Sequence, residues 1–199
     1  QLAKEDKPIV VWGYPVADKN YVVVGGDNVG GGYAATKLLL ELGRRKIAFF
    51  GDIDNPENAA RHEGYLRALQ EHSVPTNPEL EVDVPFDMQG AREVIIDLLD
   101  SGIELDAVVC ISDVMALAAL STIQDVGLRV PQDIAVVGYD DIKLAAYSSP
   151  ALTTVRQNIR HAGRILVESV LGLIRGEDVP DTTLSSELIR RKSSGARAE

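Results

Sequence analysis

Short runs of wholly apolar residues alternate with longer amphipathic stretches along this chain. In residues 47–50 (Ile-Ala-Phe-Phe) and 107–111 (Ala-Val-Val-Cys-Ile) every side chain is apolar. A strand of this composition is buried on both faces, which is typical of a parallel sheet covered by helices on both sides. Stretches with helical spacing separate these runs, so we predict an α/β fold with parallel sheets flanked by helices.

The alternation extends over nearly the whole chain. Helical spacing predicts helices over residues 29–42, 57–72, 89–100, 114–126 and 158–175. Short apolar runs predict strands at 9–12, 21–24, 46–50, 80–84, 107–111 and 134–137, and a final edge strand at 182–191. The segment from residue 138 through Pro150 has a less regular pattern.

The composition limits the classes of function. The 199 residues carry a formal net charge of -10, which repels the phosphate backbone of nucleic acids, so we do not expect this chain to bind DNA by itself. Its single cysteine, Cys110, excludes a disulfide within the chain. No apolar stretch approaches the ~20 residues that span a bilayer, and the first residues do not resemble a signal peptide. We expect a cytoplasmic protein without membrane contact.

Polar residues gather after several predicted strands, where open α/β sheets bind their ligands. Carboxylates accept hydrogen bonds from hydroxyl groups, arginine donates in a fixed fork, and an aromatic ring packs on the C–H side of a sugar. This set therefore favours a neutral polyhydroxylated ligand, although Asp27 and Asp113, each taken alone, fit equally well as helix caps. The residues concerned are Asp27, Asp52, Arg61, Phe86, Ser112, Asp113 and Asp140.

One glycine-rich segment imitates a dinucleotide-binding motif. Residues 30–35 (Gly-Gly-Gly-Tyr-Ala-Ala) match G-x-G-x-x-A at a helix start, and Asp52 follows Gly32 by twenty residues. However, residues 27–29 separate the preceding strand from these glycines, whereas a phosphate-binding turn places them at the end of the strand. Helix entry and close packing therefore explain the glycines better.

The sequence lacks the patterns of catalytic and metal sites. His62, His72 and His161 do not have the spacing of metal ligands. There is no G-x-x-x-x-G-K-[ST] and no G-x-S-x-G, and Cys110 lies inside a predicted strand. We expect no enzymatic activity, no metal and no cofactor.

Several blocks of sequence carry a family resemblance. The longest are 127–141 (Gly-Leu-Arg-Val-Pro-Gln-Asp-Ile-Ala-Val-Val-Gly-Tyr-Asp-Asp) and 149–157 (Ser-Pro-Ala-Leu-Thr-Thr-Val-Arg-Gln), supported by 61–65 (Arg-His-Glu-Gly-Tyr) and 112–117 (Ser-Asp-Val-Met-Ala-Leu). In this order they resemble the effector-binding core of the LacI/GalR family of transcriptional repressors. The resemblance covers nearly the whole chain. It implies an effector-binding and dimerisation domain whose ligand, expected to be a carbohydrate, controls DNA binding in the full-length protein.

The resemblance also implies a two-lobed fold of the type I periplasmic-binding-protein kind. By analogy, the first lobe comprises residues 1–53 and 155–180, and the second comprises 54–154 and 181–199. Family members begin with a helix-turn-helix domain and a strand-helix-strand unit that are absent from this sequence, so we expect an incomplete first lobe. The implied protein is a homodimer that contacts operator DNA only through that absent domain.

Five positions correspond to effector-binding positions of the family, and one of them departs from the usual residue. Arg61 resembles the effector-binding arginine, Asp140 the effector-binding aspartate, and Phe86 the aromatic residue that lines the pocket. Ser112 stands where many relatives have asparagine, and Asp113 is the aspartate that usually follows. The resemblance leads us to expect that Arg61→Ala or Asp140→Ala abolishes the effector response and leaves thermal stability nearly unchanged.

Four further residues are assigned with the same resemblance. Asn55 and Glu57 fall in the variable loop that tunes effector choice, and Trp12 and Tyr14 are expected in the pocket wall of the first lobe. Two other functions stay open at this point. A periplasmic sugar-binding protein of a transporter would share the fold, and a nucleotide-dependent oxidoreductase would explain the glycine-rich segment.

Overall fold

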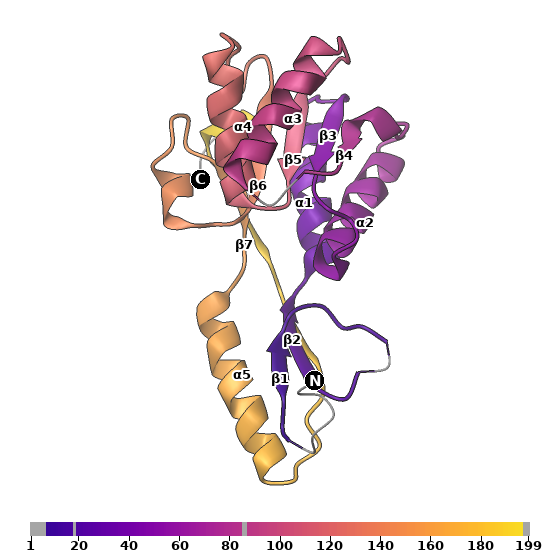
Figure 1. The fold of residues 1–199 in the computed structure, drawn as a ribbon, viewed down its shortest axis with the longest axis vertical. Helices are drawn as coiled ribbons and strands as arrows, with labels where there is room; N and C mark the ends of the chain where they lie inside the picture. Colours follow the sequence, from indigo (N-terminus) through magenta and orange to yellow (C-terminus); the bar gives the residue numbers. More distant parts are fainter. Residues whose placement is uncertain (1–6, 18, 85–86, 197–199) are drawn as a thin grey trace. The chain divides into compact units, whose positions relative to one another are not determined.

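The chain forms two compact units, each built from segments that are distant in the sequence. A computed structural model describes residues 7–17, 19–84 and 87–196. The first unit contains residues 1–27 and 157–186, and the second contains residues 28–156 and 187–199. The chain therefore crosses from one unit to the other three times, after Asp27, after Arg156 and after Ser186 (Figure 1).

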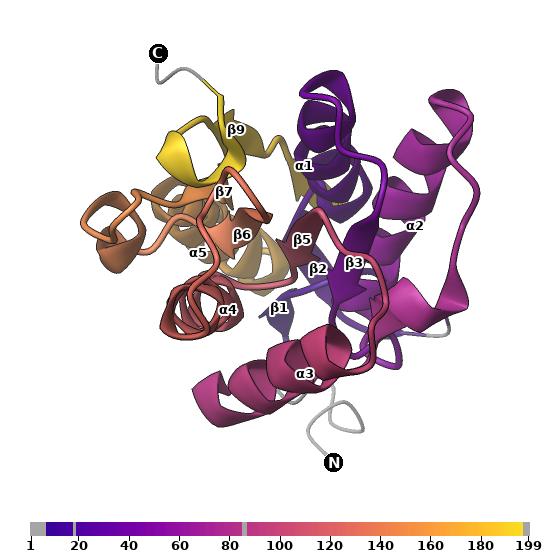
Figure 2. The same ribbon diagram turned by 90° about the horizontal axis from the view of Figure 1, so that it is seen from above.

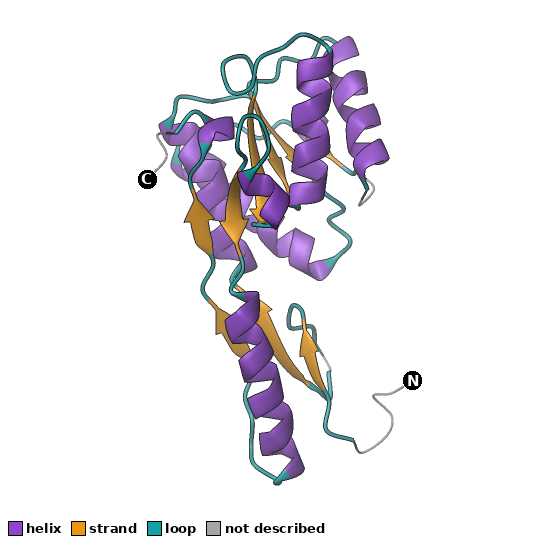
Figure 3. Cartoon of the chain, turned by 90° about the vertical axis from the view of Figure 1, so that its left-hand side faces the viewer, coloured by secondary structure: helices purple, strands orange, loops and turns teal. Residues whose placement is uncertain are grey.

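The first unit is a small parallel sheet with one helix. Its strands β1 (Val10–Trp12), β2 (Val22–Gly26) and β8 (Thr182–Leu184) lie in the order β1-β2-β8. The central strand β2 is fully buried, and helix α5 (Ile159–Ile174) packs against β1 and β2 (Figure 3). The sequence predicted an incomplete first lobe, and the sheet of this unit has three strands among the described residues.

The second unit contains a six-stranded sheet in the order β4-β3-β5-β6-β7-β9. Neighbouring strands are parallel, except that β9 runs antiparallel to β7. The parallel part was predicted, and the antiparallel edge was not. The strands are β3 (Ile47–Phe50), β4 (Glu81–Val82), β5 (Ala107–Cys110), β6 (Ala135–Asp140), β7 (Thr153–Arg156) and β9 (Glu187–Ile189).

Four helices cover the two faces of this sheet. Helices α1 (Asn28–Glu41) and α2 (Pro56–Glu71) pack against each other on one face, and α3 (Met88–Asp100) and α4 (Asp113–Asp125) do so on the other (Figure 2). Strands β3 and β5 are buried along their whole length, as their wholly apolar composition predicts. Short 3₁₀ helices lie at Pro78–Leu80, Lys143–Ala146 and Lys192–Ser194.

The division into units differs from the predicted lobes in the first segment. The analogy assigns residues 28–53 to the first lobe, whereas α1 and β3 lie in the second unit. The reason is pairing and packing, because β3 pairs with β5 and α1 packs on α2. The later crossovers lie a few residues beyond their predicted places near 154 and 180.

Two further segments differ from the sequence prediction. Residues 182–191, predicted as one edge strand, form β8 in the first unit and β9 in the second, with the crossover after Ser186 between them. The predicted lobes place a crossover between residues 154 and 155, whereas residues 153–156 form strand β7, which pairs with β6 and β9. Both segments are too short and too polar for the pattern of alternation to separate strand from connection.

Helices α1 and α2 approach each other closely because glycines line their contact. A Cβ atom on Gly32 would overlap the carbonyl oxygen of Arg61, and one on Gly64 would overlap the carbonyl oxygen of Val29. The glycine-rich segment thus serves close packing, the interpretation preferred from the sequence. It brings the first turns of α2 against the start of α1, where the polar residues of the sheet edge lie.

No helix among the described residues is long and apolar enough to span a membrane.

Candidate functional site

The carboxyl ends of three neighbouring parallel strands define one edge of the six-stranded sheet. Strand β3 ends at Phe50, β5 at Cys110 and β6 at Asp140, and the three are adjacent in the sheet. Helices α2 and α4 begin just after β3 and β5, so their first turns lie at this same edge. Ligands of open α/β sheets bind at such an edge, and most of the predicted site residues lie there.

Arg61 is held at the centre of this edge by three different segments. Its Nε donates to Oδ1 of Asn28 at 2.8 Å, and its Nη1 donates to the carbonyl oxygen of Ile111 at 2.6 Å. The guanidinium carbon lies 3.9 Å from the centroid of the Tyr139 ring, a cation–π contact. Only 7% of Arg61 is exposed, so the side chain is a fixed part of the second unit.

The close fit of Tyr139 depends on a glycine of α1. A Cβ atom on Gly31 would overlap the hydroxyl oxygen and the ring of Tyr139. The tyrosine is buried beside α1, with its ring under the Arg61 guanidinium. Because protein atoms fill the space beside Gly31 and Gly32, these glycines have no room for the pyrophosphate of a dinucleotide.

The first turn of α2 carries the two predicted residues that lie near Arg61 in sequence. Asn55 is the N-cap, and its Oδ1 accepts from the backbone N–H of Glu57 at 2.9 Å. Glu57 lies four residues before Arg61 and therefore on the same side of the helix. Its Oε1 is buried and has no hydrogen-bond partner among the described residues. A buried acceptor without a partner is costly, and a ligand that donates a hydrogen bond would satisfy it.

Ser112 and Asp113 begin helix α4 and are buried. Ser112 is the N-cap, with its Oγ accepting from the backbone N–H of Met115 at 3.3 Å. Asp113 accepts from Oγ1 of Thr154 at 2.6 Å and from the backbone N–H of Ile142 at 2.8 Å. Both side chains therefore form hydrogen bonds within the protein. Ser112 caps helix α4, and Asp113 links α4 to β7 through Thr154.

The environment of Asp113 favours its protonated form. Burial raises the pKa of Asp113 to about 7, and the nearby charges of Asp140 and Asp141 act in the same direction. The hydrogen bonds from Thr154 and from the N–H of Ile142 oppose this shift only in part. A carboxyl group that titrates near neutrality therefore lies behind the edge of the sheet.

Asp140 and Asp141 follow one another at the end of β6 in an unusual backbone conformation. Their φ angles are 110° and 55°, a region that residues other than glycine rarely adopt. Such residues cost about 1–3 kcal/mol each and are common at functional sites. Asp140 is half-buried at the strand end, where it was predicted to contact the effector.

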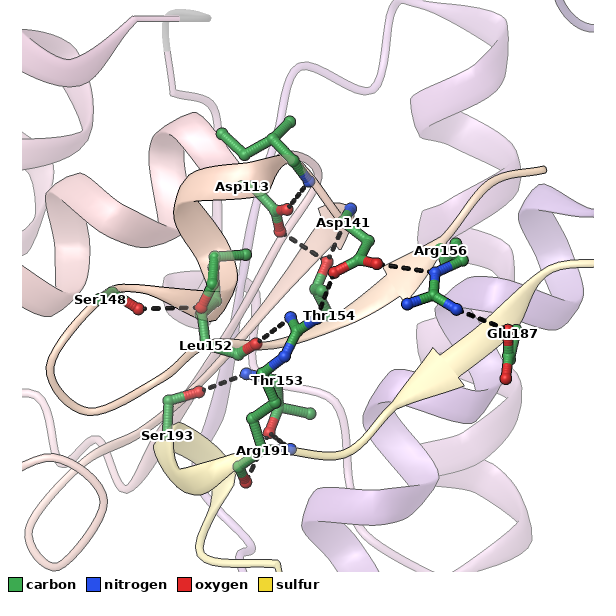
Figure 4. A network of polar contacts seen from close by, with 12 residues as sticks. Asp113, Asp141, Ser148, Leu152, Thr153, Thr154, Arg156, Glu187, Arg191 and Ser193 are labelled. Atoms are coloured by element: carbon green, nitrogen blue, oxygen red, sulfur yellow. Dashed lines mark hydrogen bonds and ion pairs between the residues drawn. The ribbon is translucent and has the colours of Figure 1, made fainter. Parts of the chain in front are cut away.

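Asp141 joins the end of β6 to the strands that lead to the crossovers (Figure 4). Its carboxylate accepts from Nε of Arg156 on β7 at 2.7 Å and from Nη2 of Arg191, which follows β9, at 2.6 Å. Arg156 also contacts Glu187 on β9 at 3.2 Å. Burial alone would raise the pKa of Asp141, but the hydrogen bonds from Arg191 and Arg156 outweigh it and lower the pKa.

The C-terminal segment is fixed to the same strands by buried hydroxyl groups. Ser193 Oγ donates to the carbonyl oxygen of Val136 at 2.6 Å and accepts from the backbone N–H of Thr153 at 2.8 Å. Arg191 donates from Nη1 to the carbonyl oxygen of Leu152 at 2.8 Å (Figure 4). The polar network therefore runs from α4 through the β6 end to β7, β9 and the C-terminal segment.

The predicted site residues fall in both compact units. Arg61, Asn55, Glu57, Ser112, Asp113 and Asp140 all belong to the same edge of the second unit. Trp12 on β1 and Tyr14 just after it are half-buried in the first unit. Phe86 lies outside the described residues. The ligand-binding roles of all these residues stay predictions.

Sequence reasoning assigned no role to the residues that support the site from behind, although Asn28, Tyr139 and Asp141 follow predicted strands. Asn28 is the first residue of a helix and follows a glycine-rich strand end. A polar side chain at such a position usually indicates a helix cap, so the sequence did not indicate a contact with Arg61. Tyr139 and Asp141 lie beside Asp140 in a family block, and this proximity was a signal. Nothing in the sequence indicated that Arg156 and Arg191 bind one carboxylate, because their contact depends on the pairing of β7 with β9.

Among the described residues, no group of three or more His, Cys, Asp or Glu side chains is placed to hold a metal ion.

Comparisons with known proteins agree with this fold. A family described as "Periplasmic binding protein-like domain" matches residues 36–194. The chain is 42% identical over 146 residues to the HTH-type transcriptional repressor PurR of Aliivibrio salmonicida, a match that covers 73% of this chain and 44% of that protein. The chain spans about half the length of the curated relatives that it matches.

Solved structures give the same result. A transcriptional regulator CelR–cellobiose complex has a TM-score of 0.87 and 34% identity, covering 92% of this chain and 58% of that one. A transcriptional regulator of the LacI family from Sanguibacter keddieii has a TM-score of 0.88 and 32% identity, covering 95% of this chain and 72% of that one. The predicted fold class is therefore confirmed, and the relatives named are transcriptional repressors and regulators rather than enzymes.

Proposed function

This chain belongs to the LacI family of transcriptional regulators, whose periplasmic-binding-protein-like effector domain it carries, and we propose that its effector is a neutral hydroxylated molecule, most simply a sugar. The proposed binding site is the sheet edge formed by the ends of β3, β5 and β6. Arg61, Glu57 and Asp140 contact the effector, with Asn55 at the rim.

The observation that carries this proposal is the chemistry of Glu57 and Arg61. The buried Oε1 of Glu57 requires a hydrogen-bond donor, and the fixed guanidinium of Arg61 offers donors one helical turn away. A sugar hydroxyl group both donates and accepts, so one polyol can satisfy both residues. The negative charges of Glu57 and Asp140 would repel a phosphate or carboxylate group of a ligand.

A relative supports the same class of ligand. The regulator CelR, similar to this chain in fold and sequence, forms a complex with cellobiose. Sugar binding by a related domain makes a sugar the first effector to test, although the specific sugar differs among relatives of this kind.

Ligand control of DNA binding follows from the family membership as a further part of the proposal. We place the response in the network of Asp141, Arg156 and Arg191, because it joins the ligand-binding edge to the strands next to two crossovers. A ligand shifts such an equilibrium only by its different affinity for two states of the protein. In the full-length protein we propose a homodimer that binds operator DNA through a helix-turn-helix domain.

Isothermal titration calorimetry of the full-length protein tests this function. Cellobiose, D-ribose, hypoxanthine and NAD are titrated separately, and we expect binding of a sugar. Glu57→Gln should weaken sugar binding roughly 10-fold or more, since a hydrogen bond to a charged group contributes about 1.5–3 kcal/mol. Glu63→Gln, an exposed position on the same helix, is the matched control and should leave affinity unchanged. Tight binding of NAD or hypoxanthine without any sugar response would overturn the proposal.

A further inference from the structure

Asn28 is a buried polar residue at the point where the chain enters the second unit. It is the first residue of α1 and directly follows Asp27, the last residue of the first segment of the first unit. Only 1% of the residue is exposed. Its Oδ1 accepts the hydrogen bond from Nε of Arg61 at 2.8 Å. A side chain placed only to begin a helix would not need to be this deeply buried or to bind a residue of another helix.

The contacts of Arg61 fix its guanidinium plane from three directions. Asn28 binds the Nε end, the carbonyl oxygen of Ile111 binds Nη1, and the ring of Tyr139 lies against one face. A guanidinium group has five N–H donors. Among the described residues its hydrogen bonds are made by Nε and Nη1, and none is made by Nη2.

We propose that Asn28 is a positioning residue for the effector site, whose hydrogen bond to Arg61 Nε orients the guanidinium so that its remaining donors face the ligand. Without the bond to Asn28, the guanidinium could still turn about its Nη1 contact above the Tyr139 ring. The bond on Nε removes this freedom. The role for the ligand rests on the proposed function, whereas the orientation of Arg61 does not.

Packing of α1 on α2 makes this arrangement possible. Gly32 and Gly64 allow the two helices to approach until their backbones touch, with Gly32 against the carbonyl of Arg61 itself. At this separation the short side chain of asparagine reaches Nε of Arg61. An alanine at position 28 would leave the Nε–H without its acceptor in a buried place.

Three variants of the full-length protein separate positioning from general stability. Asn28→Ala removes the acceptor. Asn28→Asp keeps an acceptor oxygen at the same place and should restore the function. Thr36→Val is the matched control, because Thr36 is fully buried on the same helix and bonds only to the carbonyl of Gly32 within that helix. It removes one buried hydrogen bond of α1 and no hydrogen bond of Arg61.

The first measurement needs no ligand. The Nε–H proton of Arg61 gives an NMR signal in protein labelled with ¹⁵N-arginine, assigned by its loss in Arg61→Lys. We expect slow exchange of this proton in the parent protein, in Asn28→Asp and in Thr36→Val, and exchange about tenfold faster in Asn28→Ala. An unchanged signal in Asn28→Ala would overturn the positioning role.

The second measurement uses cellobiose and D-ribose by calorimetry. For whichever sugar binds, affinity should fall about tenfold in Asn28→Ala, recover in Asn28→Asp and stay unchanged in Thr36→Val. Equal losses in Asn28→Ala and Thr36→Val would reduce Asn28 to a structural residue and overturn the inference. If neither sugar binds the parent protein, the proposed function fails, while the NMR result still decides whether Asn28 orients Arg61.

Discussion

The carboxylate of Asp141 lies 2.7 Å from Nε of Arg156, and this pair connects the end of β6 to the residue that precedes the second crossover. The same carboxylate also accepts from Arg191, so one aspartate binds an arginine of β7 and a second arginine that follows β9. Asp141 holds this position although its φ is 55°. The strain indicates that the contacts of the side chain, and not the preference of the backbone, determine the conformation.

Removing the Asp141 carboxylate should destabilise the second unit. Asp141→Ala leaves Arg191, whose side chain is 16% exposed, without its charged partner, so we expect a loss of about 1–3 kcal/mol in the free energy of unfolding. Urea denaturation followed by circular dichroism measures it. Asp133→Asn breaks the exposed Arg129–Asp133 pair and is the control, with an expected loss below about 1 kcal/mol. Equal losses in the two variants would contradict a special role for Asp141.

Asp113 should give the protein an unusual pH dependence of stability. Its pKa rises from an ordinary value of 3.8 to about 7 on folding, so between these values the folded chain holds a proton that the unfolded chain has released. Stability from this group is therefore present at low pH and is lost as pH rises from about 4 to 7, by up to about 1.4 kcal/mol per pH unit.

The variant Asp113→Asn tests this sign. The amide can accept the hydrogen bond from the N–H of Ile142 and does not titrate, so the variant should gain stability relative to the parent as pH rises from 4 to 7. Above pH 7 the difference should be constant. Denaturation curves at several pH values measure it, and a difference that is flat across the whole range would show that Asp113 does not carry the raised pKa.

Much of the architecture was predictable because apolar periodicity reports burial directly. Strands β3 and β5 are apolar at every position, and helix α5 has a clear apolar spacing, so these elements were predicted close to their observed bounds. The prediction was wrong for residues 182–191 and 153–156. These residues form strands β8, β9 and β7 because of the distant strands with which they pair. Pairing of this kind leaves no local pattern in the sequence.

The candidate site was predictable in its residue types but not in their roles. Polar residues at strand ends indicated Arg61, Ser112, Asp113 and Asp140, and the structure places them at one sheet edge. Their surroundings differ, because the side chains of Ser112 and Asp113 are buried and form hydrogen bonds within the protein. Sequence position gives no measure of burial for a polar side chain, so Asn28 could not be recognised as the partner of Arg61.

Close packing at Gly64 should make it intolerant of a methyl group. A Cβ atom there would overlap the carbonyl oxygen of Val29 and the backbone nitrogen of Tyr33, and backbone atoms cannot move aside as a flexible side chain does. Gly64→Ala should therefore force α1 and α2 apart and lower the free energy of unfolding by about 1–3 kcal/mol.

Gly163 provides the matched control for Gly64. It lies inside helix α5, and a Cβ atom at this position would meet nothing within 4 Å. Gly163→Ala should raise stability by about 0.5–1 kcal/mol, because alanine favours the helix more than glycine does. Opposite signs for the two substitutions in thermal unfolding would support the packing argument, and a stabilising Gly64→Ala would refute it.

Burial of Arg61 revises the expectation for its substitution. From the resemblance alone, Arg61→Ala should leave thermal stability nearly unchanged. In the structure, however, only 7% of Arg61 is exposed. Its side chain donates hydrogen bonds to Oδ1 of Asn28 and to the carbonyl oxygen of Ile111. Alanine removes the hydrogen bonds to these two acceptors and leaves a cavity over Tyr139, so we now expect a loss of about 2–5 kcal/mol as well as loss of effector binding.

Arg61→Lys separates the two effects. Lysine keeps the charge but offers a compact ammonium group that cannot reach Asn28 and Ile111 in the planar geometry of a guanidinium. Effector affinity should therefore fall as far as in Arg61→Ala, while part of the stability returns because the side chain still fills the space above Tyr139. The exposed Arg67→Ala on the same helix should change neither quantity by more than about 1 kcal/mol. Full effector affinity in Arg61→Lys would mean that charge alone is recognised, and that the fixed fork has no part in binding.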